Sequence, residues 1–445
     1  MEKITKTTVE YPFLQKPVVI YERENGHKIV CAYKEGGLVN ISTWVKTGSI
    51  NENDENTGIS HFLEHLMFKG THKHAAGEFD KTLEAKGAIV NAATWKDYTF
   101  YYVTLPKGPD DKYFHLALDL HADMMLDPVI PENEVGEPFD INNPVIKQKR
   151  ERHVVIEEIR MREDQPWTKT YNALNHGMYT SHPYKRDVIG TADVISGVSR
   201  DTIMEYYNTH YVPNMMTTII VGDFNFDDVI EEIIDKFDFK GRPNSDIVSY
   251  SIDKPHQETK YIENYLNINT GFLMFGYLGT VAVDLKTNII LDMLAIILGE
   301  GQSSRLYQNL IEKNKDSIFN VVSCDCYQFR DGGNFFVQAN FDPAKKDIAV
   351  EMVKNEIEKL YSEKITEKEF KKAVKKLKAR FADSAETVSD ISETIGYYMT
   401  VCNGLELVDE YLSTLESITI DDIQKEAQKY LDLNKATISV LMPKV

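Results

Sequence analysis

Two histidines and a glutamate lie on one face of a predicted helix near the N-terminus. They are His61, Glu64 and His65 of the segment HFLEHLMFKGT, residues 61–71. Residues three and four apart share a helix face, so these three side chains project together. Two imidazoles at this spacing can bind one Zn²⁺, and the carboxylate between them can reach a water molecule on the metal without ligating it. The alternative is an amphipathic helix whose histidines are ordinary core or surface residues.

A catalytic zinc site needs a third protein ligand and one open position for water. The segment ERHVVIEEIRMRED, residues 151–164, has helical spacing and supplies several carboxylates. Glu151 and Glu158 share a half-apolar face, whereas Glu157 points elsewhere. A carboxylate on a face that becomes buried needs a cation, a proton or a hydrogen-bond donor. We therefore favour Glu158 over Glu157 as the third ligand, with Glu151 behind it as a supporting group. A solvated acidic face is the alternative.

Length and composition indicate a folded, acidic chain with more than one domain. The chain has 445 residues, of which 42% are apolar and 27% charged, and these values exclude a disordered or fibrous protein. Its 50 Lys and Arg against 69 Asp and Glu give a net charge of −19. That charge disfavours a nucleic-acid partner, because phosphate contacts need clustered cations, and it favours basic peptides.

The cysteine content and the apolar runs bear on the cellular compartment. Four cysteines do not form a disulfide framework, and the Cys324-x-Cys326 pair is more typical of core packing than of a metal site. The N-terminal segment lacks the apolar stretch of a secretory signal, and no run approaches the ~18–20 apolar residues of a membrane span. We therefore expect a cytoplasmic protein with no membrane span.

The two halves of the sequence follow the same order of predicted elements. In the first half, periodicity predicts strands over 17–50, 88–105 and 217–224, and helices over 57–69, 110–126, 148–163, 200–208 and 226–237. In the second half it predicts strands over 270–277, 319–326, 333–341 and 436–442, and helices over 284–298, 345–361 and 367–380. The last strand, ATISVLM, matches TTIIVGDF at 217–224 in character. We predict a duplicated α+β domain.

The domain boundary is predicted at a polar stretch with Gly and two Pro. The residues KGRPNSDIVSYSIDKPH occupy 240–256. We expect an N-terminal zinc-binding catalytic domain over 1–238, a linker over 239–257, and a C-terminal domain of similar fold over 258–445.

Five segments follow one another in an order that is typical of a known family: HFLEHLMFKGT, NAATWKDYTFYYVTLP (91–106), ERHVVIEEIRMRED, HPYKRDVIGT (182–191) and YYNTHYVPNMMTTIIVGDF (206–224). Together they resemble the pitrilysin family of zinc metallopeptidases, and in particular its two-domain, processing-peptidase-like subunits. The resemblance covers nearly the whole chain. It implies a zinc endopeptidase in which His61, His65 and Glu158 bind one Zn²⁺ per chain, and Glu64 is the general base that activates water.

The resemblance also implies a fold and a mode of substrate binding. The fold is α+β, with two homologous αβ-roll domains, each a mixed or antiparallel sheet with helices on one face, forming half of a clam-like shell. Residues 90–94, VNAAT, resemble the family's edge strand, onto which an unfolded peptide or presequence adds as a further strand. Asn91, Ala92 and Ala93 are the expected substrate contacts, because small side chains allow another backbone to approach. An ordinary strand is the alternative.

One departure from the family pattern concerns the C-terminal half. The family's peptidases carry an Arg and a Tyr, seven residues apart, after a Gly-Ser-rich loop. Here the loop GEGQSSR is present at 299–305, but Ile311 and Ile318 stand at those two positions. Isoleucine neither donates a hydrogen bond nor carries charge. We therefore expect the zinc-bearing half of a heterodimer, in which a homologous zinc-less subunit supplies the Arg and Tyr. The alternatives are a self-sufficient homodimeric peptidase and a non-catalytic scaffold or peptide-binding subunit.

A second departure is the long separation between His65 and Glu158. The surplus lies in PENEVGEPFDINNPVIKQKR, residues 131–150, which is rich in Pro, Asn and acidic residues. This composition predicts an inserted loop that leaves both ligand helices intact.

Overall fold

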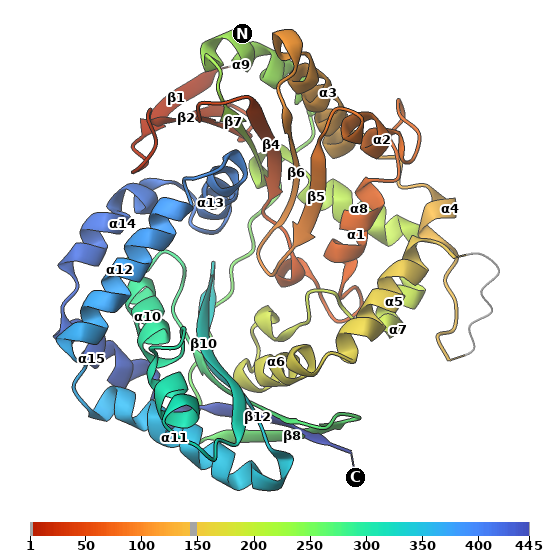
Figure 1. The fold of residues 1–445 in the computed structure, drawn as a ribbon. Helices are drawn as coiled ribbons and strands as arrows, with labels where there is room; N and C mark the ends of the chain where they lie inside the picture. The colour runs from red at the N-terminus through yellow and green to blue at the C-terminus, as the bar shows by residue number, and fades with distance from the viewer. Residues whose placement is uncertain (1–2, 143–148, 445) are drawn as a thin grey trace. The chain divides into compact units, whose positions relative to one another are not determined.

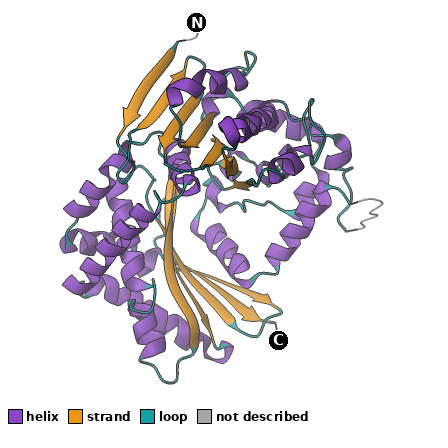
Figure 2. Cartoon of the chain, turned by 45° about the horizontal axis from the view of Figure 1, so that its top comes forward, coloured by secondary structure: helices purple, strands orange, loops and turns teal. Residues whose placement is uncertain are grey.

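The structure, a computed structural model, describes residues 3–142 and 149–444, so part of the predicted insertion, residues 143–148, lies outside the described residues. The chain forms two compact units, and each has its own β-sheet (Figures 1 and 2). The N-terminal unit consists of Met1–Ile159, Asp187–Val248 and Phe381–Asp409. The C-terminal unit consists of Arg160–Arg186, Ser249–Arg380 and Glu410–Val445.

The N-terminal unit contains a seven-stranded sheet in the order β1-β2-β3-β7-β4-β6-β5. Neighbouring strands are antiparallel apart from β3 and β7, which are parallel. Every residue of β7 is buried, as expected for a strand with both faces covered. The strands are β1 (Ile4–Val9), β2 (Val18–Arg23), β3 (Lys28–Tyr33), β4 (Leu38–Val45), β5 (Ile89–Thr94), β6 (Thr99–Pro106) and β7 (Met216–Gly222).

The C-terminal unit contains a five-stranded sheet in the order β10-β11-β9-β12-β8. Its strands are antiparallel apart from β12 and β8, which are parallel. They are β8 (Lys260–Leu266), β9 (Gly271–Leu278), β10 (Phe319–Phe329), β11 (Gly332–Phe341) and β12 (Thr437–Pro443).

The two sheets repeat one topology. The order β3-β7-β4-β6-β5 and the order β8-β12-β9-β11-β10 have the same connections and the same strand directions. The strand β12 takes the place in its sheet that β7 takes in the other, so the predicted correspondence of 436–442 with 217–224 is confirmed. The α+β class with mixed sheets is likewise confirmed.

Helices from each unit form a layer on one face of its sheet. In the N-terminal unit, Phe62, Phe114 and Ile233 pack in one core with Ile41 and Val103 of the sheet. The helices of this unit are α1 (Ile59–Met67), α2 (Glu78–Glu84), α3 (Lys112–Leu126), α4 (Glu132–Val135), α5 (Glu151–Glu163, whose last turn enters the C-terminal unit), α7 (Ala192–Gly197), α8 (Arg200–His210), α9 (Phe226–Lys236) and α13 (Val388–Val401).

The C-terminal unit has the same kind of core. Leu294, Val353 and Ile423 of its helices pack with Phe275 and Val337 of its sheet. Its helices are α6 (Pro166–Met178), α10 (Leu285–Leu298), α11 (Lys346–Ser362), α12 (Glu367–Asp383, whose last residues enter the N-terminal unit), α14 (Glu406–Ser417, whose first turn lies in the N-terminal unit) and α15 (Ile420–Tyr430). Among the described residues, no helix combines the length and apolar character needed to cross a membrane.

Each sheet also carries one helix on its other face, and that helix comes from the opposite half of the sequence. Helix α13 packs on β4 and β7 of the N-terminal sheet, and α6 packs on β8, β9 and β12 of the C-terminal sheet. The predicted domains, 1–238 and 258–445, are contiguous. In the structure, residues 160–186 belong to the C-terminal unit and residues 381–409 to the N-terminal unit. Neither helix was anticipated from the sequence, because the signal that places each one lies in a sheet far along the chain.

Glycines allow both exchanged helices to approach their sheets closely. A Cβ on Gly396 of α13 would overlap the ring of Trp44, and a Cβ on Gly177 of α6 would overlap Ile262. On the sheet side, a Cβ on Gly276 would lie 2.6 Å from the sulfur of Met178. Helix α13 begins with a capping box between Thr387 and Asp390.

The long connection between the units has no helix or strand over residues 243–256, inside the predicted linker. The unit boundary falls at Val248 and Ser249. On one side the Ser245 amide donates to the Asn214 side chain, and on the other the Tyr250 amide donates to Asp331. Both ends of this segment are therefore held by their own unit.

We predict that Gly396→Ala lowers the free energy of unfolding by about 1–2 kcal/mol. Overpacking against Trp44 costs about 1–3 kcal/mol and exceeds the roughly 1 kcal/mol that alanine gains over glycine in a helix. Urea unfolding followed by tryptophan fluorescence measures the change. Gly197→Ala is the matched control, because no atom lies within 4 Å of its added Cβ. Equal stabilities for the two variants would contradict the packing argument.

Candidate metal centre

Helix α1 begins where the sequence predicts. Its first residues follow Gly58, which has φ 89° and lies so near Ile189 that an added Cβ would be 2.5 Å from the carbonyl oxygen. The buried carboxylate of Glu52 accepts hydrogen bonds from the amides of Gly58 (2.7 Å) and Ser60 (3.0 Å). Glu52 thus satisfies free N–H groups at the positive end of the helix. The helix ends at Met67, two residues before the end of the predicted range 57–69.

Packing of α1 fixes the direction of its chemical groups. Phe62, Leu63 and Leu66 are fully buried in the core. The side chains of His61 and Glu64 are also largely buried, with only 8% and 9% of each residue exposed. The rings of His61 and His65 lie edge to face with centroids 4.7 Å apart. Both imidazoles are therefore presented together at the edge of a packed core.

Helix α5 brings Glu158 to the two histidines. Glu158 Oε2 lies 3.8 Å from His61 Nε2 and 3.6 Å from His65 Nε2. The three ligand atoms all lie within 4.8 Å of one another. Atoms bonded to one zinc at about 2.0–2.1 Å with tetrahedral angles are roughly 3.3–3.5 Å apart. The two separations from Glu158 are a few tenths of an ångström longer than this, and the set of two imidazoles and one carboxylate has the chemistry of a zinc site.

Glu151 supports the centre from behind. Its Oε1 lies 2.9 Å from His65 Nδ1, and its Oε2 forms an ion pair with Lys69 Nζ at 2.7 Å. This arrangement leaves His65 Nε2 facing Glu158. Burial alone lowers the pKa of His65, but hydrogen bonds to Glu151 and Glu158 and the charge of Glu64 raise it to about 9. A metal bound at this site would therefore displace a proton from His65 at neutral pH.

Arg152 holds α5 in its place. The residue is fully buried, and its guanidinium lies over the ring of Phe62 of α1 at 5.5 Å. It donates hydrogen bonds to the carbonyls of Gly136, Ile195 and Val198. Burial lowers its pKa to about 10. These contacts fix the rotation of α5, so that Glu151 and Glu158 face α1.

Glu64 contacts the strand at the edge of the N-terminal sheet. The Thr94 hydroxyl, at the end of β5, donates a hydrogen bond of 2.6 Å to Glu64 Oε2. The strand β5 pairs with β6 alone among the described strands. Asn91 and Ala93 are exposed and Ala92 is half-buried. The carboxylate and the free strand edge are thus joined through one side chain, Thr94.

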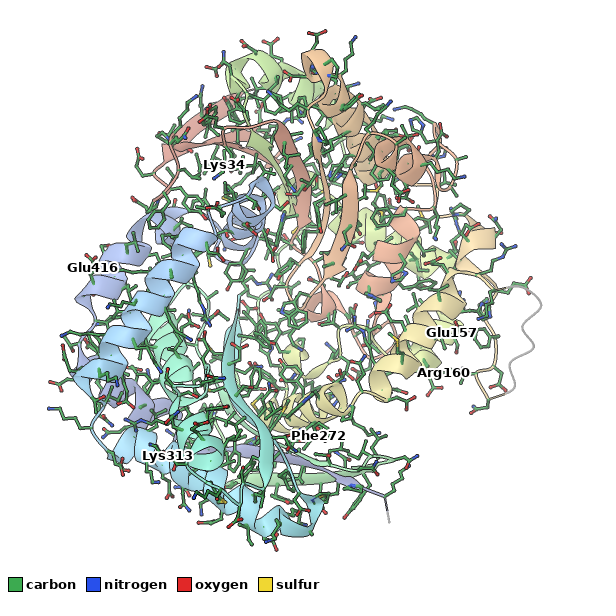
Figure 3. All side chains as sticks on the ribbon, in the orientation of Figure 1. Lys34, Glu157, Arg160, Phe272, Lys313 and Glu416 are labelled. Atoms are coloured by element: carbon green, nitrogen blue, oxygen red, sulfur yellow. The ribbon has the colours of Figure 1, made fainter. Side chains whose placement is uncertain are left out.

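The other residues singled out by the sequence lie away from the centre. Glu157, labelled in Figure 3, is exposed on α5 and pairs with Lys149 at 2.7 Å. Ile311 and Ile318 pack against the core of the C-terminal unit. The predicted insertion is anchored where it is described, since Phe139 stacks on His153 with centroids 4.9 Å apart.

Sequence reasoning missed three residues that position this centre. Glu52 caps α1, Arg152 anchors α5, and Thr94 contacts Glu64. In the sequence alone, an Arg inside an acidic helix and a Thr in a strand are weak indications of a role near a metal centre. Their roles depend on backbone atoms that only the fold brings near.

Comparison with known proteins gives the class of this chain. Residues 28–192 match the family profile described as Insulinase (Peptidase family M16), and residues 197–377 match Peptidase M16 inactive domain. Zinc protease PqqE of Helicobacter pylori is 28% identical over 432 residues, covering 94% of this chain and 91% of its own. The uncharacterized zinc protease YmxG of Bacillus subtilis is 26% identical over 414 residues, covering 92% and 94%.

A solved structure agrees with these matches. The crystal structure of a protease from Helicobacter pylori superposes with a TM-score of 0.84 at 26% identity, covering 99% of this chain and all of the other. Profiles, relatives and fold thus point to one class, the zinc metallopeptidases. The chain belongs to the pitrilysin family, peptidase family M16.

We predict that Glu151→Gln weakens zinc binding about 10–100-fold, the usual effect of losing a group that orients a metal-ligating histidine. Replacing the Glu151 carboxylate with an amide removes the negative charge that interacts with Lys69 and with His65. Competition against a chromogenic chelator measures the dissociation constant. Glu157→Gln makes the same change at an exposed position of the same helix and should leave zinc affinity unchanged. Equal losses in both variants would contradict the assigned role of Glu151.

Proposed function

We propose that this chain is a zinc-dependent endopeptidase subunit that cleaves unfolded peptides or presequences. The proposal rests on one observation, the convergence of ligand atoms of His61, His65 and Glu158 within 4.8 Å beside the carboxylate of Glu64. Two histidines and one carboxylate leave a coordination position open, as catalytic zinc sites require. Family membership and relatives named zinc proteases support the same activity.

Glu64 carries the proton chemistry in this proposal. Zinc, when bound, supplies Lewis acidity to a water molecule and to the peptide carbonyl. Glu64 accepts the proton of the attacking water and delivers it to the leaving amine. The Thr94 hydroxyl donates a hydrogen bond to Glu64 Oε2 and so orients the carboxylate for this transfer.

The edge strand β5 is the proposed binding site for the substrate backbone. Asn91, Ala92 and Ala93 present a strand edge with small side chains, two of them exposed. A peptide that pairs with this edge gains backbone hydrogen bonds that require little of its sequence. Because Thr94 ends the same strand and contacts Glu64, a peptide bound there runs beside the general base.

The C-terminal unit supports the proposal of a partner subunit. Ile311 and Ile318 are apolar and face their own core, so neither can stabilise a developing oxyanion. We propose a heterodimer in which a homologous zinc-less subunit supplies the Arg and Tyr, with a homodimer as the alternative. The four free cysteines suit a reducing compartment, and we propose a cytoplasmic location.

The first test is cleavage of a quenched-peptide library by the purified chain, alone and with candidate M16 partner subunits. We expect one zinc per chain and chelator-sensitive cleavage that depends on the partner. Glu64→Gln should retain zinc and lose at least about 100-fold in kcat, because general acid–base catalysis contributes about 10²–10⁴-fold.

The outcomes separate the alternatives. Full activity of the chain alone would remove the need for a partner and leave the peptidase proposal intact. A folded chain without stoichiometric zinc, inactive with every partner, would point to a scaffold or peptide-binding subunit. Activity that survives Glu64→Gln would remove Glu64 from the mechanism.

A second prediction concerns Thr94. We expect Thr94→Val to lower kcat about 10–100-fold with little change in KM, because the general base loses the hydroxyl that orients it. Zinc content should not change. Thr94→Ser keeps the hydroxyl and should retain most of the activity. If the Ser and Val variants lose equal activity, packing rather than the hydrogen bond explains the effect.

A further inference from the structure

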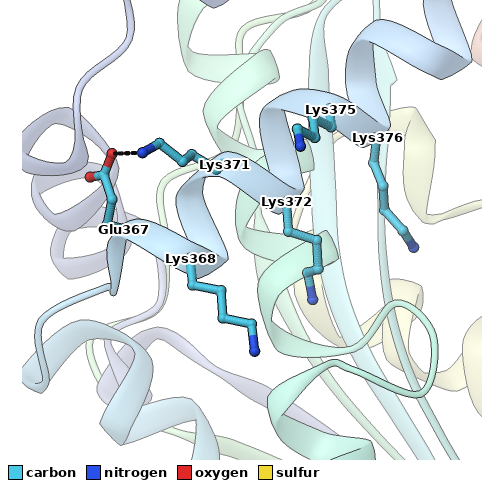
Figure 4. A pocket seen from close by; sticks show the side chains of 6 residues that line it. All are labelled: Glu367, Lys368, Lys371, Lys372, Lys375 and Lys376. Atoms are coloured by element: carbon cyan, nitrogen blue, oxygen red, sulfur yellow. Dashed lines mark ion pairs between the residues drawn. The ribbon is translucent and has the colours of Figure 1, made fainter.

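Helix α12 carries a row of lysines along one side. Lys368, Lys371, Lys372, Lys375 and Lys376 recur at intervals of three and four residues and so share a helix face. Figure 4 shows Lys368, Lys372 and Lys376 projecting from the same side of the helix. At 1.5 Å per residue, the row is about 12 Å long.

Packing fixes the direction of this row. Ala373 and Leu377, on the other side of α12, are buried in the core of the C-terminal unit. Lys368, Lys371 and Lys375 are exposed. The helix cannot rotate to mix the lysines with acidic neighbours, because rotation would expose its apolar face.

The row borders two adjoining hollows, each of about 670 Å³, which share Lys368 and Lys372. Nine cationic and four acidic side chains line them, so positive charges exceed negative charges by five, in a chain whose net charge is −19. Ser303, Gln308 and Asn309 add uncharged hydrogen-bonding groups. We call this surface, from Lys376 along α12 to Thr366 and over Ser303–Lys313, the basic groove.

Part of the positive charge in the basic groove is neutralised within the chain, since Arg305, Lys359 and Lys376 pair with Glu369, Glu356 and Glu300, and part of it is not. In the described part of the chain, neither Lys368 nor Lys375 has an ion-pair partner. The pair of Lys371 with Glu367 is exposed on both sides and therefore weak. Like charges four residues apart destabilise a helix. The pKa of Lys372 is lowered, first by burial and then by the charge of Lys376. The groove is thus suited to an anion.

We propose that the basic groove binds an acidic segment of a partner protein. Lys368 and Lys372 are about 6 Å apart along the axis, and Lys375, which has no ion-pair partner among the described residues, lies about 4.5 Å beyond Lys372. Alternate residues of an extended peptide are about 6.6–6.8 Å apart, so successive carboxylates on one side of an acidic segment can each meet a lysine. Each of the Gln308 and Asn309 amides already donates one N–H, to the Gln302 carbonyl and to Glu356, and its second N–H is a further donor for such a peptide.

The lining favours a protein over other polyanions. No aromatic side chain lines either hollow, whereas single-stranded nucleic acid is usually held by stacking on aromatic rings. None of the large exposed apolar side chains lies among the lining residues, so nothing there inserts into a lipid surface.

The position of α12 in the repeated topology corresponds to that of α5 in the N-terminal unit. Helix α12 is the second long helix between β11 and β12, as α5 is between β6 and β7. The N-terminal unit uses that helix to present Glu158, and the C-terminal unit uses its counterpart to present lysines. The basic groove is therefore independent of the peptidase proposal.

The test is fluorescence anisotropy of a labelled oligoglutamate peptide titrated with the full chain. A chelator is present, so that carboxylates cannot bind a metal at the centre. The triple variant Lys368→Gln, Lys372→Gln, Lys375→Gln should bind about tenfold more weakly, given the modest contribution of each exposed ion pair. Lys3→Gln, Lys112→Gln, Lys254→Gln makes the same change in net charge at exposed positions elsewhere and should bind within about twofold of the original chain.

Three outcomes would overturn the proposal. They are no oligoglutamate binding at low salt, equal losses in the two triple variants, and binding of oligothymidylate or phosphatidylserine vesicles through the same lysines at equal or higher affinity. Glutamine preserves helix propensity, and circular dichroism verifies that both variants fold.

Discussion

The candidate metal centre depends on one constraint, the rotation of α5 relative to α1. Two candidate ligands come from α1 and the third comes from a helix more than eighty residues later in the chain. A rotation of α5 by one residue, about 100°, would remove Glu158 from the histidines and Glu151 from His65 at the same time. Arg152 prevents it, because its buried charge is satisfied by three backbone carbonyls that occupy fixed positions. The chemistry of the site therefore rests on a residue that is not part of it.

The duplicated sheets show how one topology can hold different chemistry. In the N-terminal unit, helices between the strands of the sheet carry His61, Glu64, His65 and Glu158. In the C-terminal unit, the corresponding regions carry isoleucines that complete a core and lysines that face solvent. The two sheets share one strand order, and the side chains on the helices that connect the strands differ.

The sequence predicted those features that depend on local periodicity. His61, Glu64 and His65 lie within one helix, and Glu151 and Glu158 lie on one face of another, so helical spacing alone identified them. The strands β7 and β12 were recognisable as short apolar runs. Glu52, Thr94 and Arg152 were not recognisable, because each acts on atoms distant in the chain. The exchange of α6 and α13 could not be predicted for the same reason. Gly177 and Gly396 allow a close approach to Ile262 and Trp44, which are distant from them in the sequence.

The exchange of α6 and α13 has a consequence for synthesis on the ribosome. The N-terminal sheet is complete in sequence once β7 has emerged, but the helix that covers the face with Trp44 ends at Val401, far later in the chain. Until α13 has been synthesised, that face of the N-terminal sheet is uncovered. In the same way, α6 is synthesised long before β12, the strand of its sheet that ends at Pro443. The two halves therefore cannot complete their folding one after the other, as domains of a growing chain usually do. The nascent chain must therefore keep this apolar surface from aggregating until α13, which ends at Val401, has emerged.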